Sequence, residues 1–130
     1  MARTLLLLLL AVSIVAEAAL AAGAFFAPVF TLQQFQVAYS PDTAFLGYVL
    51  GWTLLFVTLV AAVAFGQVWR RRRHFATLCY LLGFWWIGIG LGIYFAFGRP
   101  ANLGLDTAKG LLLVLATWRC QRQRLIARLY

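Results

Sequence analysis

Four long apolar stretches alternate with short polar segments along the chain. The apolar stretches cover about residues 4–30, 44–68, 75–98 and 103–118. The second and third contain no charged residue, the first contains only Glu17, and the fourth carries Asp106 and Lys109 in its first two turns. Because about 20 apolar residues in a helix cross the hydrocarbon core of a bilayer, the pattern predicts an all-α integral membrane protein with a four-transmembrane-helix bundle. The fourth span requires Asp106 and Lys109 to lie near the interface with water.

Turn and capping residues separate the predicted spans. Ser40-Pro41-Asp42-Thr43 supplies an N-cap hydroxyl, a first-turn proline and an acid near the positive helix end, just before the second span. Gly98-Arg99-Pro100 ends the third span, because proline cannot continue the backbone hydrogen bonding of a helix. Little chain remains for a separate soluble domain, so residues 1–130 are predicted to form a single transmembrane domain.

The two ends of the chain have their own patterns. Residues 119–130 alternate apolar and basic positions, which predicts a short amphipathic helix on the membrane surface or against a partner subunit. At the other end, an apolar run follows Arg3 and leads to Ala16-Glu17-Ala18, as in a secretory signal with a small-residue cleavage site. Because the run continues to Phe30, we favour an uncleaved membrane anchor.

Composition supports a bilayer and excludes other classes. Of the residues, 65% are hydrophobic and 11% are charged, which is too apolar for a soluble domain or a disordered basic tail. A nucleic-acid-binding module is disfavoured, because nothing would cover so much apolar surface in water. The chain carries a formal net charge of +8.

Nine of the eleven cations flank the predicted spans on one side. They are Arg3, Arg70, Arg71, Arg72, Arg73, Arg119, Arg122, Arg124 and Arg128. The positive-inside rule makes this side cytoplasmic, with both termini inside. We therefore expect a multi-pass protein, in a bacterial inner membrane.

Glu17 is the main candidate for chemistry, because an ionisable group near the middle of a span is costly and points to function. It is interpreted either as a proton- or cation-coupling carboxylate, or as an acid bonded to a hydroxyl such as Ser13, Thr53 or Thr58, or paired with a cation. An acid in the first of four short spans resembles the small multidrug-resistance exporters, although this resemblance is limited to Glu17. The size, the four spans and the charged outer end of the last span are loosely similar to DoxX-type proteins. Neither family is assigned.

A second candidate site is the cluster of Arg99, Asp106 and Lys109 at the predicted outer end of the bundle. Asp106 and Lys109 are three residues apart, so they are the favoured pair. The Lys109 stem could instead point toward Glu17. A simpler interpretation is that the cluster only sets the depth of the fourth helix.

Small residues predict where helices pack. Gly47 and Gly51 share one face of the second span, and Gly88 and Gly92 share one face of the third. Because close approach of small residues holds membrane helices together, these pairs predict a contact between the second and third spans. The alternative is that glycine is simply common in membrane helices.

The basic turn Arg70–Arg73 is expected to contact anionic lipid headgroups, at about 1 kcal/mol per cation, although topology alone explains the run. No cofactor or metal is predicted, since His74 is the only histidine and the thiols of Cys79 and Cys120 are far apart in sequence. Trp85 and Trp86 lie mid-span, and helix packing is favoured for them over a quinone- or pigment-like ligand.

No nucleophile, base and acid set is present, so catalysis is not expected. The sequence favours a non-catalytic accessory or structural subunit of a larger membrane complex, contacting the lipid bilayer and other subunits or further copies of itself. The alternative is a small oligomeric transporter or channel that uses Glu17. A membrane enzyme or a lipid- or quinone-binding protein is the third possibility.

Overall fold

The computed structural model describes residues 2–72 and 74–126, and this part of the chain is helical without a strand. Its long helices are α1 (Ala2–Phe26), α3 (Pro41–Trp69), α4 (Phe75–Phe97) and α6 (Ala108–Ile126). Its short ones are α2 (Pro28–Gln34), α5 (Pro100–Asn102) and the π-helical turn η1 (Leu103–Thr107). The all-α prediction is confirmed.

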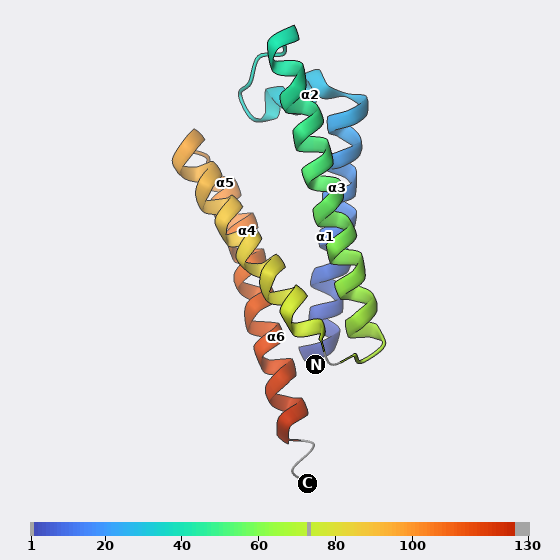
Figure 1. The fold of residues 1–130 in the computed structure, drawn as a ribbon. Coiled ribbons are helices and arrows are strands. Elements are labelled where there is room, and N and C mark those ends of the chain that lie inside the picture. Colours follow the sequence, from blue (N-terminus) through green and yellow to red (C-terminus); the bar gives the residue numbers. More distant parts are fainter. Residues whose placement is uncertain (1, 73, 127–130) are drawn as a thin grey trace.

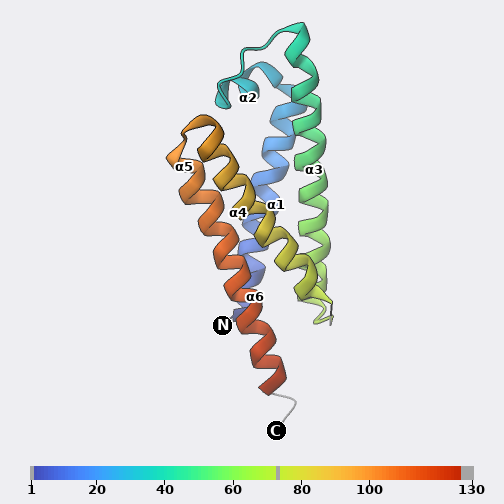
Figure 2. The ribbon, with the colours of Figure 1, turned by 60° about the vertical axis from the view of Figure 1, so that its left-hand side comes forward.

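The long helices form two antiparallel hairpins, α1 with α3 and α4 with α6 (Figures 1 and 2). The hairpins lie together near the α3–α4 turn and diverge toward α2 and α5, as Figure 1 shows. Where they meet, the core contains side chains from all four long helices, such as Leu10, Ala61, Cys79, Trp86 and Leu113.

Each long helix buries only a narrow stripe. In α1 the buried positions recur every three or four residues: Ala2, Leu6, Leu10, Ser13, Glu17, Ala21 and Ala24. The other faces expose large apolar side chains, including Val15 at 71%, Phe84 at 62% and Phe95 at 80%. Since an amphipathic soluble helix would carry polar residues there, these outer faces match a lipid environment. Among the described residues, three helices, α1, α3 and α4, are long and apolar enough to span a membrane.

The predicted fourth span differs from the others. Its first five residues, 103–107, form η1, and α6 carries Lys109 near its start and Arg119, Arg122 and Arg124 near its end. Because these charges interrupt the apolar run, three helices rather than four meet the length and hydropathy requirements of a span. The tail prediction also changes: α6 continues without a break to Ile126, so no separate helix begins at 119. Residues 127–130 lie outside the described part.

Local signals set several helix ends, and the predicted N-cap at Ser40 is confirmed. Ser40 and Thr43 form a capping box: the Thr43 backbone N–H donates to Ser40 Oγ at 3.2 Å, and the Ser40 N–H donates to Thr43 Oγ1 at 2.7 Å. Gly98 ends α4 in the left-handed conformation, with φ 63°. Pro28 divides the first apolar stretch, so that α1 ends at Phe26 and α2 follows.

Arg3 ties the beginning of α1 to the end of α3. Its Nη2 donates to the Trp69 carbonyl at 2.8 Å and its Nε to the Val68 carbonyl at 3.3 Å. Carbonyls at a helix C-terminus lack partners within the helix and lie at its negative end. A cation that was expected only to orient the chain therefore also caps a helix.

Glycine contacts join helices within each hairpin. A Cβ on Gly47 would lie 3.5 Å from Pro28 Cβ, and a Cβ on Gly51 would lie 2.9 Å from the ring of Phe25. Within the described part of the chain, a Cβ on Gly88 or Gly92 would meet nothing within 4 Å. The structure thus differs from the contact predicted between the second and third spans, because Gly47 and Gly51 face the first apolar stretch instead.

In the other hairpin, Gly83 and Gly110 allow α4 and α6 to approach closely. A Cβ on Gly110 would lie 2.5 Å from the Gly83 carbonyl oxygen and 2.9 Å from the Ile87 backbone nitrogen. Both neighbours are backbone atoms, so the helices would have to move apart to accept a methyl group.

The Gly110→Ala variant is therefore expected to destabilise the fold. Overpacking of this kind costs about 1–3 kcal/mol, more than the roughly 1 kcal/mol that Ala gains over Gly in helix propensity. Thermal unfolding in detergent, followed by circular dichroism, should show a lower midpoint. Gly88→Ala is the matched control, with an unchanged or higher midpoint. Equal midpoints for the two variants would contradict the α4–α6 contact.

Candidate functional site

The buried carboxylate of Glu17 lies where the two hairpins meet. Glu17 belongs to the buried stripe of α1 and is 6% exposed. Its Oε1 accepts a hydrogen bond from Trp86 Nε1 at 3.0 Å and pairs with Lys109 Nζ at 3.1 Å. Glu17 of one hairpin therefore binds both helices of the other, through Trp86 of α4 and Lys109 of α6.

Lys109 is the centre of this group. Besides Glu17, its ammonium contacts Asp106 Oδ1 at 3.3 Å and lies 4.4 Å from the centroid of the Trp86 ring. Asp106 also accepts a hydrogen bond from Asn102 Nδ2 at 3.2 Å through its second oxygen. Two carboxylates and an aromatic face thus surround one ammonium, an arrangement that compensates for its partial removal from water.

The turn η1 brings these groups to α4. Gly90, one turn after Trp86, packs directly on Thr107, and a Cβ there would also lie 3.1 Å from the Asn102 carbonyl oxygen. Because Gly90 has no side chain, η1 can lie against α4, with Asp106 and Lys109 beside Trp86. Thr107 Oγ1 is buried there and has no hydrogen-bond partner in the described residues.

The hydroxyls that were considered as partners of Glu17 bond elsewhere. Ser13, Thr53 and Thr58 each donate to the backbone carbonyl four residues earlier in their own helix, at 2.7–2.8 Å. Of the structural interpretations of Glu17, the cation partner is the one that the structure contains.

The predicted cluster at the outer end is only partly assembled. Asp106 and Lys109 form the expected pair. Arg99 is the N-cap residue of α5 and is not among the ion-pair partners of Asp106 and Lys109 in the described part of the chain. The cluster therefore contains Glu17 in place of Arg99.

Sequence reasoning considered Trp86 only as a packing residue and missed its hydrogen bond to Glu17. Trp85 is 41% exposed, whereas Trp86 is 1% exposed and bonded to Glu17. The signal that distinguishes them is periodicity, because Trp86 continues the helical spacing of Cys79, Gly83 and Gly90 on one face of α4.

The remaining candidates lie near the other end of the hairpins. Arg70, Arg71 and Arg72 are exposed at the α3–α4 turn, and Arg73 lies outside the described residues. His74 is the exposed N-cap residue of α4. The buried thiol of Cys79 lies near Thr117 and Cys120 of α6. In the described residues no three His, Cys, Asp or Glu side chains are grouped as metal ligands.

No protein-family model matches this chain, and no curated protein or solved structure is significantly similar to it.

Lys109→Met is expected to be far more destabilising than Glu17→Gln. Removal of one partner leaves a buried charge uncompensated and costs about 3–5 kcal/mol, here with Glu17 and Asp106 both losing their cation. In Glu17→Gln, the amide oxygen still accepts from Trp86 Nε1, and Lys109 retains Asp106. Thermal unfolding in detergent measures both.

Arg99→Met is the control for loss of a cation near this end of the bundle. It should change the midpoint little, since Arg99 is outside the ion-paired cluster. If Arg99→Met and Lys109→Met were equally destabilising, the assignment of Lys109 as the central cation would be wrong.

Proposed function

We propose that this chain is a multi-pass membrane protein that acts as a non-catalytic accessory subunit of a larger membrane assembly. The observation that supports this proposal is that the charged groups are paired inside the molecule while its outer surface is apolar. In the apolar part, Glu17 and Asp106 both pair with Lys109, whereas large apolar side chains face outward. Such a molecule can pack its apolar surface against a neighbouring helix or a lipid, and it presents few polar groups that could bind a polar substrate.

The outward faces are rich in the side chains that packing between membrane helices can use. Phe56 of α3 is 67% exposed, and Phe84, Trp85 and Phe95 of α4 are all exposed. Phe25 and Trp52 form an edge-to-face pair at 5.7 Å between α1 and α3. Flat aromatic groups supply large contact areas at low entropy cost, so they support lateral association.

We further propose that α6 crosses the membrane as a fourth pass. Its only charge before Arg119 is Lys109, and the pairing with Glu17 and Asp106 lowers the energetic cost of placing this ammonium below the interface. Figure 1 shows the N-terminus, the α3–α4 turn and the end of α6 toward the same end of the molecule. Among the described residues these segments carry seven of the chain's eleven cations, Arg3, Arg70, Arg71, Arg72, Arg119, Arg122 and Arg124, so we assign this end to the cytoplasmic side.

Photo-crosslinking in native membranes tests the accessory role. A photoreactive amino acid in place of Phe56, Phe84 or Phe95 should give an adduct of discrete mass with another membrane protein on at least one helix face. The same group in place of Gln36, an exposed residue between α2 and α3, is the control. Lipid adducts alone at every apolar position would contradict the proposal, and adducts with a second copy of the chain alone would favour the transporter below.

A second candidate is a small oligomeric transporter or channel, favoured by the composition of the cluster. Glu17, Asp106 and Lys109 comprise two carboxylates and one ammonium, so one carboxylate can exchange a proton or a cation while the other remains paired. Glu17 lies at the contact between the two hairpins, where it bonds to Trp86 and Lys109.

Proteoliposomes separate the two candidates. With a pH-sensitive dye inside, the accessory role predicts the same proton flux for wild type, for Glu17→Gln and for empty vesicles. A flux in wild type that Glu17→Gln abolishes, and Arg99→Met leaves intact, would replace the accessory role with coupled transport.

A further inference from the structure

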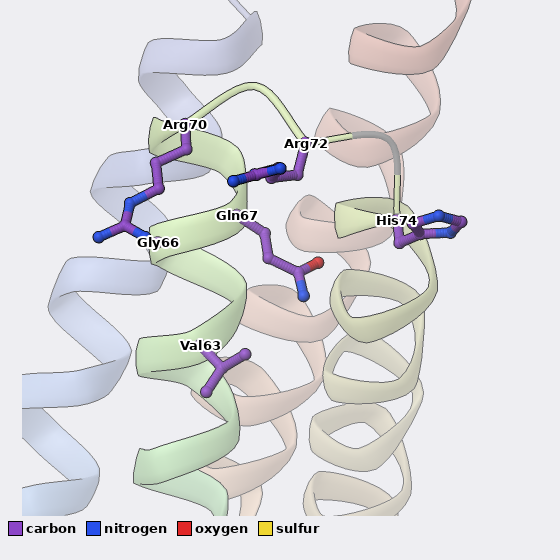
Figure 3. Close-up of a pocket in the computed structure, with 6 residues that line it drawn as sticks. All are labelled: Val63, Gly66, Gln67, Arg70, Arg72 and His74. Atoms are coloured by element: carbon purple, nitrogen blue, oxygen red, sulfur yellow. The ribbon is translucent and has the colours of Figure 1, made fainter.

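The α3–α4 turn contains a pocket of about 440 Å³ that the ion-paired cluster does not use. Its lining residues come from the last two turns of α3 and from the turn itself: Val63, Gly66, Gln67, Arg70, Arg72 and His74 (Figure 3). The pocket therefore combines an apolar floor, an amide and basic side chains at the basic end of the molecule.

Two features of the pocket indicate a ligand. Gln67 Oε1 is buried and has no hydrogen-bond partner within the described residues, and a buried acceptor without a partner is unfavourable unless something donates to it. Gly66 leaves open space, because a Cβ there would meet no described atom within 4 Å. A group that fits must fill space over Gly66 and donate a hydrogen bond to Gln67.

The charge of the pocket specifies the rest of the ligand. Arg72 reaches back over the end of α3, above Gln67 in the view of Figure 3, while Arg70 lies along α3 and the His74 ring points away from that helix. Arginine side chains match phosphate geometrically and electrostatically. The ligand should therefore carry a phosphate and, next to it, a hydroxyl.

The level of the pocket relative to the bilayer favours a lipid over a soluble phosphate ester as its ligand. Trp69, two residues after Gln67, is 62% exposed and stacks on Phe65 with ring centroids 6.2 Å apart. Exposed tryptophan at the end of an apolar helix is typical of the headgroup level of a bilayer. Below the pocket, the exposed apolar side chains Leu59 and Val63 on α3 can contact an acyl chain.

We propose that this pocket binds the headgroup of one anionic glycerophospholipid, with its phosphate at Arg72 and Arg70 and a headgroup hydroxyl donating to Gln67 Oε1. Phosphatidylglycerol has this chemistry. The site rests on the proposed membrane embedding of the chain but does not depend on the accessory role. It goes beyond the general attraction of a basic turn to anionic lipid, because it requires a hydroxyl and a single bound molecule.

Native mass spectrometry of the purified full chain in detergent tests the site. Phosphatidylglycerol is compared with phosphatidylmethanol, which has the same phosphodiester charge but no headgroup hydroxyl, and with neutral phosphatidylcholine. We expect one retained phosphatidylglycerol, with about tenfold preference over phosphatidylmethanol, the size of effect that one buried hydrogen bond supplies. The preference over phosphatidylcholine should be larger, because that lipid lacks both the hydroxyl and the net negative charge.

Three variants test the individual contacts. Arg72→Gln should reduce the preference over phosphatidylcholine and leave the preference over phosphatidylmethanol. Gln67→Leu should remove the preference over phosphatidylmethanol and leave the charge-dependent part of the preference over phosphatidylcholine. Gly66→Leu should block the pocket while α3 remains intact, since leucine is a better helix former than glycine. Matched controls are Arg122→Gln, an exposed arginine of α6, and Gly88→Leu, which also has open space at its Cβ.

The outcomes are distinct. Retention of the preference by Gly66→Leu, or equal binding of phosphatidylglycerol and phosphatidylmethanol by wild type, would overturn the site. Displacement of the lipid by equimolar glycerol phosphate would identify a site for a soluble phosphate ester instead, and would overturn the lipid assignment. Because the assay uses the purified chain alone, its failure leaves the crosslinking test of the accessory role untouched.

Discussion

The ion pair between Glu17 and Lys109 is the interaction on which the arrangement of the two hairpins depends. Each hairpin is built from neighbouring helices in the sequence, but the hairpins themselves share only the narrow core near the α3–α4 turn. Glu17 crosses this boundary and bonds to both helices of the second hairpin, through Trp86 and Lys109. In an apolar environment an uncompensated charge is far less favourable than a paired one. The two hairpins are therefore held in the relative position that keeps these groups together.

Contacts within and between the hairpins use different chemistry. Within the second hairpin, Gly83 and Gly110 let the backbones of α4 and α6 approach closely. The carbonyl oxygen of each glycine lies close to where a Cβ of the other would be. Lipid offers no hydrophobic advantage to helix association, so such close packing and hydrogen bonds must supply the stabilisation. Between the hairpins, the bonds of Glu17 add to an apolar core, and Gly90 links the two kinds of contact. By admitting η1 against α4, it places Lys109 where Glu17 can reach it.

The sequence predicts the parts of this structure that local chemistry decides. The N-cap at Ser40 and the end of α4 at Gly98, before Pro100, depend on a few adjacent residues, and both predictions are confirmed. The helices that pack on Gly47 and Gly51 could not be predicted from local sequence. A small residue permits close approach without specifying which helix approaches. The partner of Glu17 was open for a similar reason, since hydroxyls and a lysine all lay within plausible reach. The partner is decided by the packing of η1 on Gly90, which brings Lys109 to Glu17. This π-helical turn has no sequence signature from which its position could be predicted.

Charged side chains have different roles at the two ends of the molecule. Toward α5 they pair within the chain, whereas at the α3–α4 turn basic side chains line the pocket where a ligand is proposed to bind. Toward α5, Lys109 is satisfied inside the chain, so a ligand there would have to compete with Glu17 and Asp106 for it. At the other end, Arg3 donates to the carbonyls that end α3. Arg72 lines a pocket beside Gln67, whose amide oxygen has no hydrogen-bond partner among the described residues. A lipid bound at that pocket would contact the turn that joins the two hairpins. Lipid composition could then influence the same hairpin arrangement that the ion pair of Glu17 and Lys109 stabilises from within.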